Sequence, residues 1–378
     1  MQVTQVLVGA APGDAITRSA LEIDRMVAPV AATSLRARYI DPAMAGSISP
    51  LDAPEGGPRP SSEDILLLHA SIGEPDVSRW LADRPERLVV MYHNISPAQP
   101  FEAHDQGFAD LLRLGRAELP ALAERAVLTM APSAFSAAEL TDMGFADVRV
   151  CPLVFDPLAL AGIEEDPATV HHLHTVVTGP VILFVGQLLP HKRVDWLLAA
   201  YFILVTYLVP EAHLMVVGPG PLPRYRQALQ RYANELNLDR SWLTGRVTDA
   251  ELAAFYRRAD VVATASEHEG FCAPLLEAMA FGTPIVARAC AAIPETLSDA
   301  GVTVDPGDSP AVFAEALAEL IADPPAAHHP GDPDGHLGLG QTLARRGRAR
   351  LDTIGPDAAR ATLRRHLGEI VAGLDQSP

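Results

Sequence analysis

The chain has 378 residues, more than one hydrophobic core usually supports, so its length predicts two domains. Its formal net charge of −18 argues against nucleic acid as a partner, because binding a phosphate backbone requires a basic face. The three cysteines (Cys151, Cys272 and Cys290) show neither CxxC nor metal-ligand spacing. We therefore expect free thiols in the reducing cytoplasm.

Short apolar runs alternate with amphipathic stretches in the first part of the chain. A strand is expected over residues 3–9, followed by a small-residue loop and a helix over residues 17–27. Further strands are expected at 64–69, 87–92, 126–130 and 148–152. Nearly continuous apolar strands are typical of parallel sheets covered on both faces. The alternation predicts a βαβ architecture.

The rhythm breaks at residues 163–180, which are polar, contain proline and show no period. We place an interdomain linker there, with a first domain at 1–170 and a second at 178–355. A C-terminal helix at about 356–378 is a candidate to pack back on the first domain. Strands of the second domain are expected at 181–186, 213–218, 261–265 and 284–287.

Four expected absences narrow the class of protein. The apolar run at 196–209 has about 14 residues, whereas a membrane span requires roughly 20, so we expect a buried helix and no transmembrane segment. The N-terminal apolar run has no preceding basic region, so no secretory signal is expected. No G-x-G-x-x-G follows the first strand, so no dinucleotide cofactor is expected. The histidines of residues 322–340 lack helical metal spacing, and that segment is interpreted as a surface loop with no metal.

The most informative segment is residues 267–287, EHEGFCAPLLEAMAFGTPIVA. Pro274 suits the first position of a helix, and Gly282 suits its left-handed cap. The loop at 269–273 then presents backbone amides at a helix N-terminus, next to the carboxyl end of a strand. Open α/β sheets bind ligands there, and a pyrophosphate can be held there without side-chain charge. Glu277 fits either a ligand contact or a favourable acid near the positive end of the helix dipole.

The pattern E-G-F-x-x-P-x-x-E-A-M-A-x-G-x-P-[IV]-V-A resembles the Glu-x7-Glu signature of family 4, the retaining GT-B glycosyltransferases. The resemblance covers nearly all of residues 181–305 and extends weakly across the first domain. It implies an α/β GT-B fold, with two Rossmann-like domains facing each other across a cleft. It also implies that Glu269 contacts donor-sugar hydroxyls and that Glu277 binds the ribose. The diphosphate would be held by the loop residues Gly270, Phe271, Cys272 and Ala273, where Cys272 replaces the usual glycine.

Two further loops extend the resemblance. In residues 185–195 (VGQLLPHKRVD), Lys192 matches a lysine that contacts the donor diphosphate, although a lysine in such a loop can also be simply solvated. Gln187 stands where the family has an arginine, and Arg193 is a candidate replacement for that charge. In residues 243–249 (LTGRVTD), Arg246 and Val247 are candidates for contacts with the nucleobase.

The first domain contributes two candidates through the same resemblance. Gly13 lies in the loop after the first strand, which in the family approaches the donor phosphates and the acceptor. His93 directly follows the strand at 87–92 and matches a strand-end histidine held near the anomeric centre. Such a histidine can also be structural, and His69 is a weaker case of the same kind.

The resemblance implies a metal-independent, retaining hexosyltransferase without a cofactor. It would move a hexose from a GDP- or UDP-sugar to an acceptor hydroxyl on a glycan, a lipid or a small molecule. Glu269, His93 and Lys192 are the candidate catalytic residues. The alternatives are a GT-B epimerase or phosphorylase, and a non-catalytic nucleotide-sugar-binding subunit, which the absent arginine at Gln187 favours.

Overall fold

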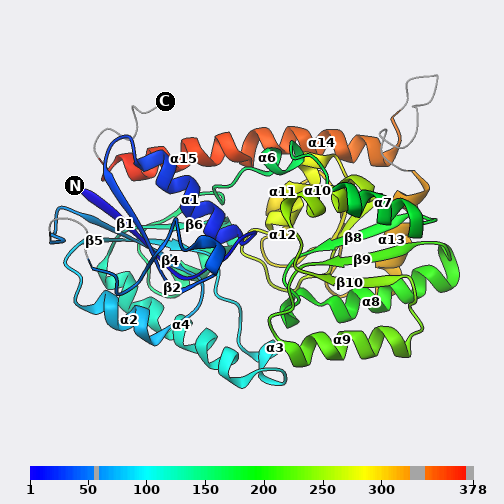
Figure 1. The fold of residues 1–378 in the computed structure, drawn as a ribbon, viewed down its shortest axis with the longest axis horizontal. Coiled ribbons are helices and arrows are strands. Elements are labelled where there is room, and N and C mark those ends of the chain that lie inside the picture. Colours follow the sequence, from blue (N-terminus) through cyan, green and yellow to red (C-terminus); the bar gives the residue numbers. More distant parts are fainter. Residues whose placement is uncertain (55–58, 324–336, 372–378) are drawn as a thin grey trace. The chain divides into compact units, whose positions relative to one another are not determined.

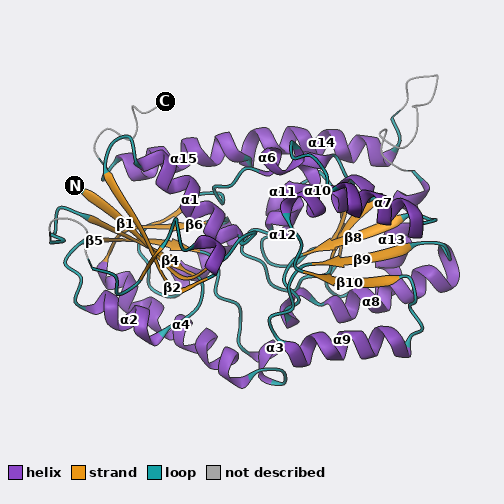
Figure 2. Ribbon diagram, in the orientation of Figure 1, coloured by secondary structure: helices purple, strands orange, loops and turns teal. Residues whose placement is uncertain are grey.

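The computed structural model describes residues 1–54, 59–323 and 337–371. Its chain divides into two compact units (Figure 1). The first unit takes Met1–Glu102, Gln106–Phe155 and the described residues from Pro356 onward. The second unit takes Ala103–Asp105 and, within Asp156–Gly355, the described residues. Each unit is a parallel sheet with helices on both of its faces (Figure 2).

The first unit contains a seven-stranded sheet in the order β3-β2-β1-β4-β5-β6-β7. Its strands are β1 (Gln2–Ala10), β2 (Ala32–Ile40), β3 (Ser49–Pro50), β4 (Ile65–Ala70), β5 (Arg87–Tyr92), β6 (Ala126–Ala131) and β7 (Val148–Val150). Its longer helices are α1 (Ala15–Val27), α2 (Pro75–Ala82), α4 (Gln106–Arg125), α5 (Ala134–Asp142) and α15 (Pro356–Gly368). A 3-10 turn η1 (Pro42–Met44) and the short helix α3 (Gln99–Glu102) complete it.

The last described helix, α15, packs into the core of the first unit. Its residues Ala359, Leu363 and Leu367 share one buried cluster with Val3 of β1 and Ile23 of α1. Figure 1 shows α15 alongside α1, and Arg360 of α15 pairs with Glu22 of α1 at 3.1 Å. The first unit is therefore built from the two ends of the chain.

The second unit contains a six-stranded sheet in the order β10-β9-β8-β11-β12-β13. Its strands are β8 (Val181–Val185), β9 (His213–Val217), β10 (Ser241–Gly245), β11 (Val261–Thr264), β12 (Ile285–Arg288) and β13 (Val302–Val304). Its helices are α6 (Pro157–Ala161), α7 (Pro167–Val176), α8 (Val194–Ile203), α9 (Pro223–Glu235), α10 (Asp249–Arg258), α11 (Ala273–Phe281), α12 (Ile293–Leu297), α13 (Pro310–Ala322) and α14 (Leu339–Ile354). A 3-10 turn η2 (Pro190–Lys192) precedes α8, and a π-helical turn η3 (Leu204–Leu208) extends it.

Both sheets reverse their strand order at one point, between β1 and β4 and between β8 and β11. Chain segments leaving the two central strands diverge at such a point, which opens a crevice at the carboxyl ends of the strands. Both units are thus Rossmann-like. Within the first unit the loop carrying Gly13 follows β1, and within the second the loops carrying Lys192 and Glu269 follow β8 and β11.

The boundary between the units differs from the expected one. The division falls between Phe155 and Asp156, so residues 156–170, which we assigned to the first domain, belong to the second unit. The segment expected as a linker contains α7, whose N-cap Asp166 accepts a hydrogen bond from the Thr169 amide at 2.7 Å. Leu173 is the buried residue of α7. Because a single buried position produces no apolar periodicity, the sequence pattern did not indicate this helix.

The apolar run at 196–209 lies in α8 and η3, as expected for a buried helix. Among the described residues, no helix is long and apolar enough to cross a membrane. Most of the segment interpreted as a surface loop, residues 324–336, lies outside the described residues.

Candidate functional site

The N-terminus of α11 is the centre of the candidate site. Cys272 is its N-cap, in a left-handed conformation (φ 68°, ψ 68°). The helix begins at Ala273, one residue earlier than expected, so Pro274 is its second residue and not its first. Gly282 ends the helix with φ 72°, as the sequence predicted. The backbone amides of Phe271, Cys272 and Ala273 have no hydrogen-bond partner among the described residues. A helix N-terminus with free amides favours an anion.

An ion pair joins the two loops at the switch point of the second unit. The Nζ atom of Lys192 lies 2.6 Å from Oε1 of Glu269, and the two side chains are 17% and 8% exposed. Burial by itself lowers the pKa of the Lys192 ammonium, but the carboxylate of Glu269 and the thiol of Cys272 raise it more, so the net pKa lies above its ordinary value. Lys192 is therefore a fixed positive charge at neutral pH.

The thiol of Cys272 lies in the same cluster. Burial, followed by the nearby carboxylate of Glu269, raises the pKa of this thiol well above its ordinary value. Thiols react as thiolates, so a raised pKa makes Cys272 a poor nucleophile. This electrostatic setting agrees with a contribution from its backbone amide rather than from its sulfur.

Glu277 lies one turn into α11 and has a defined partner. Its Oε2 atom accepts a hydrogen bond from the hydroxyl of Tyr256 at 2.7 Å, and the carboxylate is buried. Tyr256, in α10, stacks on Phe281 with ring centroids 4.8 Å apart. Tyr256 therefore orients the carboxylate, a role that the sequence did not reveal because the partner lies 21 residues away.

Arg193, the candidate substitute for the missing arginine, has acidic partners in the structure. It adopts a left-handed conformation (φ 50°), and its guanidinium pairs with Asp195 at 3.1 Å and with Glu267. Glu267 also pairs with Arg288, at the end of β12, at 3.3 Å. Arg193 is thus held in an acidic network on the loops after β8 and β11, and its charge is already compensated.

The other donor-site candidates lie at the same edge of the second sheet. Gln187 follows β8 and is exposed, and its side chain has no hydrogen-bond partner among the described residues. Arg246 is exposed and Val247 half-buried, both directly after β10. Gly270 lies half-buried between Glu269 and Phe271. The structure thus groups these residues on strand-end loops of one sheet.

The loops after β8 and β9 approach each other closely. The Leu188 amide donates to the Pro219 carbonyl at 2.8 Å. Gly218 has φ +141°, and a Cβ atom there would lie 2.0 Å from the Gly186 carbonyl oxygen. No other residue fits at Gly218 without moving one of the two loops, so this glycine allows the close approach of the loop that carries Lys192.

Gly13 and His93 belong to the first unit. Gly13 has φ +75° in the loop after β1, and Asp14 beside it caps α1 by accepting from the Thr17 amide at 2.8 Å. His93 follows β5 and is half-buried, and burial lowers its pKa to about 4. Its Nε2 lies 2.8 Å from Nδ1 of His69, so a hydrogen bond joins the two imidazole rings.

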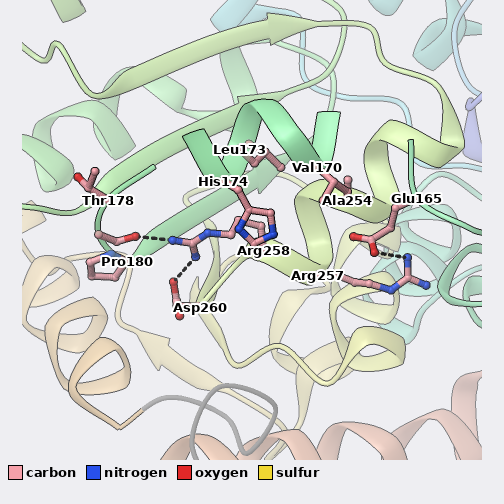
Figure 3. A pocket seen from close by; sticks show the side chains of 11 residues that line it. Glu165, Val170, Leu173, His174, Thr178, Pro180, Ala254, Arg257, Arg258 and Asp260 are labelled. Atoms are coloured by element: carbon pink, nitrogen blue, oxygen red, sulfur yellow. Dashed lines mark hydrogen bonds and ion pairs between the residues drawn. The ribbon is translucent and has the colours of Figure 1, made fainter. Parts of the chain in front are cut away.

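A cavity of about 530 Å³ lies away from these loops (Figure 3). The cavity lies at the amino ends of β8 and β11, where Pro180 and Asp260, which directly precede these strands, are among its lining residues. None of the predicted site residues lines it. Its arginines are engaged within the protein: Arg258 donates to Asp260 and to the Gly179 carbonyl, and Arg257 pairs with Glu165. The cavity lies at the opposite edge of the sheet from the carboxyl ends of the strands, where open α/β sheets bind ligands, so its position does not favour a diphosphate.

Within residues 1–54, 59–323 and 337–371, no group of three or more His, Cys, Asp or Glu side chains is arranged to hold a metal ion. All three cysteines are free.

Two Rossmann-like units of this topology define the GT-B class of fold, and solved structures of that class match the chain over nearly its whole length. Sucrose-phosphate synthase from Thermosynechococcus elongatus matches with a TM-score of 0.69 at 19% identity, covering 99% of this chain and 97% of that one. HepE of Anabaena in complex with UDP-glucose matches with a TM-score of 0.67 at 18% identity, covering 95% and 98%. At these identities the likeness establishes the fold.

The sequence match is strongest in the second unit. Residues 179–323, which lie within the second unit, match the family described as Glycosyl transferases group 1. The O-antigen chain mannosyltransferase B of Escherichia coli is 29% identical over 259 residues, 65% of this chain and 64% of that protein. A GDP-mannose-dependent phosphatidylinositol monomannoside mannosyltransferase of Mycolicibacterium smegmatis is 34% identical over 182 residues, 46% of each. The chain thus spans less than two thirds of these relatives.

Proposed function

We propose that this protein is a retaining glycosyltransferase that moves a hexose from a nucleotide diphosphate sugar to an acceptor hydroxyl on a glycan, a lipid or a small molecule. The observation that carries the proposal is the Lys192–Glu269 pair beside the free amides at the N-terminus of α11. This arrangement provides positive charge for a leaving diphosphate and a carboxylate for a neutral polyol in the same few ångströms. The matched family and the GT-B fold support it.

Each part has a distinct role in the proposed reaction. The amides of Phe271, Cys272 and Ala273 hold the diphosphate, and Lys192 stabilises the negative charge that develops on it as the bond to C1 breaks. A fixed ammonium and oriented amides require no reorganisation at that moment. Such groups perform the role that a divalent cation performs in other enzymes, so we propose metal-independent transfer, which is tested by its persistence in EDTA.

Glu269 and Glu277 divide the recognition of the donor. In the absence of a ligand, Glu269 neutralises Lys192. A diphosphate that approaches Lys192 competes for its charge, which frees Glu269 to accept hydrogen bonds from sugar hydroxyls. Glu277, oriented by Tyr256, accepts from the ribose hydroxyls. Arg246 and Val247 lie on the loop proposed to contact the base, and free thiols fit a cytoplasmic enzyme.

The donor base is tested by thermal shift with UDP, GDP and ADP. A ligand that binds only the folded state stabilises it by about 2.7 kcal/mol at a concentration 100 times its Kd. We expect one of UDP and GDP to raise the unfolding temperature clearly and ADP to leave it unchanged. The relatives named above include GDP-mannose-dependent and UDP-glucose-binding proteins, so both bases belong in the panel. A chain that none of these nucleotides stabilises would contradict the donor site.

Transfer itself is tested with Glu269→Ala. We expect loss of transfer of at least 100-fold, because the carboxylate contacts the reacting sugar, and unchanged transfer would contradict this assignment. Product analysis with and without acceptor separates transfer from epimerisation, which needs no acceptor, and from phosphorolysis, which consumes free phosphate. The anomeric configuration of the product tests retention.

A nucleotide-sugar-binding subunit without catalysis is the second candidate. It is favoured by Gln187, which supplies no charge, and by Arg193, whose charge is taken by Asp195 and Glu267. It predicts donor binding in the thermal-shift panel without any turnover of the donor.

A further inference from the structure

A buried chain of three side chains ends at His93. Gln5 of β1 and His69 of β4 are 1% and 0% exposed. The Nε2 atom of His69 lies 2.9 Å from Oε1 of Gln5, and Nδ1 of His69 lies 2.8 Å from Nε2 of His93. The two imidazole rings are nearly parallel, with 11° between their planes and centroids 5.1 Å apart. All three residues lie within the first unit, on or next to neighbouring strands.

The donor and the acceptor in each of these hydrogen bonds can be assigned by starting from Gln5. The Nε2 group of Gln5 lies 3.0 Å from the carbonyl oxygen of Ala20, which only accepts hydrogen bonds. The amide nitrogen of Gln5 therefore faces Ala20, and its oxygen faces His69. An amide oxygen also only accepts, so Nε2 of His69 carries the proton.

The remaining protons then have one arrangement. Burial, followed by the repulsion from His93 that would arise if both rings were charged, lowers the pKa of His69 well below its ordinary value, so His69 is neutral and its Nδ1 is a bare acceptor. Nε2 of His93 must therefore be the donor to it. His93 is also neutral near pH 7, which leaves its Nδ1 without a proton. That nitrogen has no partner among the described residues.

We propose that Gln5 and His69 are positioning residues that hold His93 in the Nε2-protonated tautomer and present its bare Nδ1 as an acceptor for a substrate hydroxyl. The inference rests on the proposed function for its substrate, but the tautomer itself does not. In this arrangement His93 accepts a hydrogen bond and does not supply a proton to the leaving diphosphate. In many histidines, the hydrogen bond at one ring nitrogen fixes the tautomer and so determines whether the other nitrogen donates or accepts.

The tautomers are measured directly on the full chain with ¹⁵N-labelled histidine, by long-range ¹H–¹⁵N correlation near pH 7. His93→Gln and His69→Phe identify the two sets of signals. We expect both rings to be neutral, each protonated at Nε2 alone. A charged His93, or a His93 protonated at Nδ1, would overturn the proposal, whether or not any transfer activity is found.

Variants then test the positioning. Gln5→Met keeps the length of the side chain but removes the acceptor, so we expect His69 and His93 to show both tautomers and kcat/KM for transfer to fall on the order of 10-fold to 100-fold. Thr129→Val, a buried isosteric change in β6 of the same sheet, is the control and should change neither. A single Nε2-protonated His93 in folded Gln5→Met would overturn the role of Gln5.

If the wild-type protein transferred no sugar, this result would contradict the proposed function. The tautomer measurement would still test the present inference. Normal transfer in the wild type with the wrong tautomer would contradict this inference alone.

Discussion

At the scale of single residues, the Lys192–Glu269 pair has a role in stability and a proposed role in donor binding. Both side chains are largely buried, so each charge depends on the other while no donor is bound. Replacing one member leaves the charge of the other buried without compensation, whereas replacing both leaves no buried charge. The two roles of the pair can therefore be separated by comparing single and double variants.

We expect Lys192→Met and Glu269→Gln each to lower the free energy of unfolding by about 1–3 kcal/mol, reduced from a fully buried pair because Lys192 is partly exposed. The double variant should recover most of that loss and still transfer no sugar. Denaturant unfolding and a transfer assay on the same preparations measure both. A double variant as unstable as the sum of the singles would show that the pair is not mutually compensating.

Gln187 is one of the residues at which the chain departs from the pattern that it resembles, because an arginine is usual at this position. Because its side chain is exposed and Arg193 is engaged elsewhere, Gln187→Arg adds a cation at the end of β8 without breaking a contact. A charge-assisted hydrogen bond to a phosphate predicts about tenfold tighter donor binding, equivalent to about 1.4 kcal/mol. Titration of the nucleotide measures it, with Gln187→Met as the uncharged control. Equal affinity in both variants would place position 187 outside reach of the diphosphate.

At the scale of elements, the sequence predicted what continuous apolar runs and helix caps encode. The buried strands β1, β4, β5, β8, β9 and β11 were predicted, and so was the Gly282 cap of α11. The strands β2, β3, β10 and β13 were not predicted. In β2 three buried residues lie between exposed and half-buried ends, no residue of β10 is buried, and β3 and β13 have only two and three residues. The closeness of Lys192 and Glu269 follows from strand-end loops at a switch point. The direction of Arg193 does not, because it depends on its left-handed backbone and on Glu267.

The N-cap of α11 allows a test of backbone strain. Cys272 has φ 68°, where a side chain costs about 1–2 kcal/mol relative to glycine. We therefore expect Cys272→Gly to be more stable than Cys272→Ala by about 1 kcal/mol and to retain transfer, because only the amide is needed. Ala228→Gly, in the interior of α9, is the control and should show the opposite sign. Loss of transfer in a folded Cys272→Gly variant would show that the thiol itself participates.

At the scale of the whole molecule, the first unit depends on the end of the chain. The sequence placed a boundary near residue 355 and a C-terminal helix beyond it, and the structure puts Ala359, Leu363, Leu367 and Val371 in one core with β1 and α1. That contact joins residues more than 300 positions apart (Arg360 and Glu22 are separated by 338), and local sequence patterns do not encode such pairings. The second unit, in contrast, is nearly continuous along the chain.

The consequence is that a change in α15 should destabilise the first unit and leave the proposed donor site of the second unit intact. Leu363 is fully buried, so Leu363→Ala creates a cavity and should cost about 2–4 kcal/mol. Arg365→Ala, at an exposed position of the same helix, is the control. Because Lys192, Glu269 and Glu277 lie in the second unit, we expect the folded Leu363→Ala variant to bind nucleotide with unchanged Kd while its first unit unfolds at lower denaturant. Calorimetric titration and fluorescence-detected unfolding measure the two properties, and a weakened nucleotide Kd would show that the donor site depends on the core of the first unit.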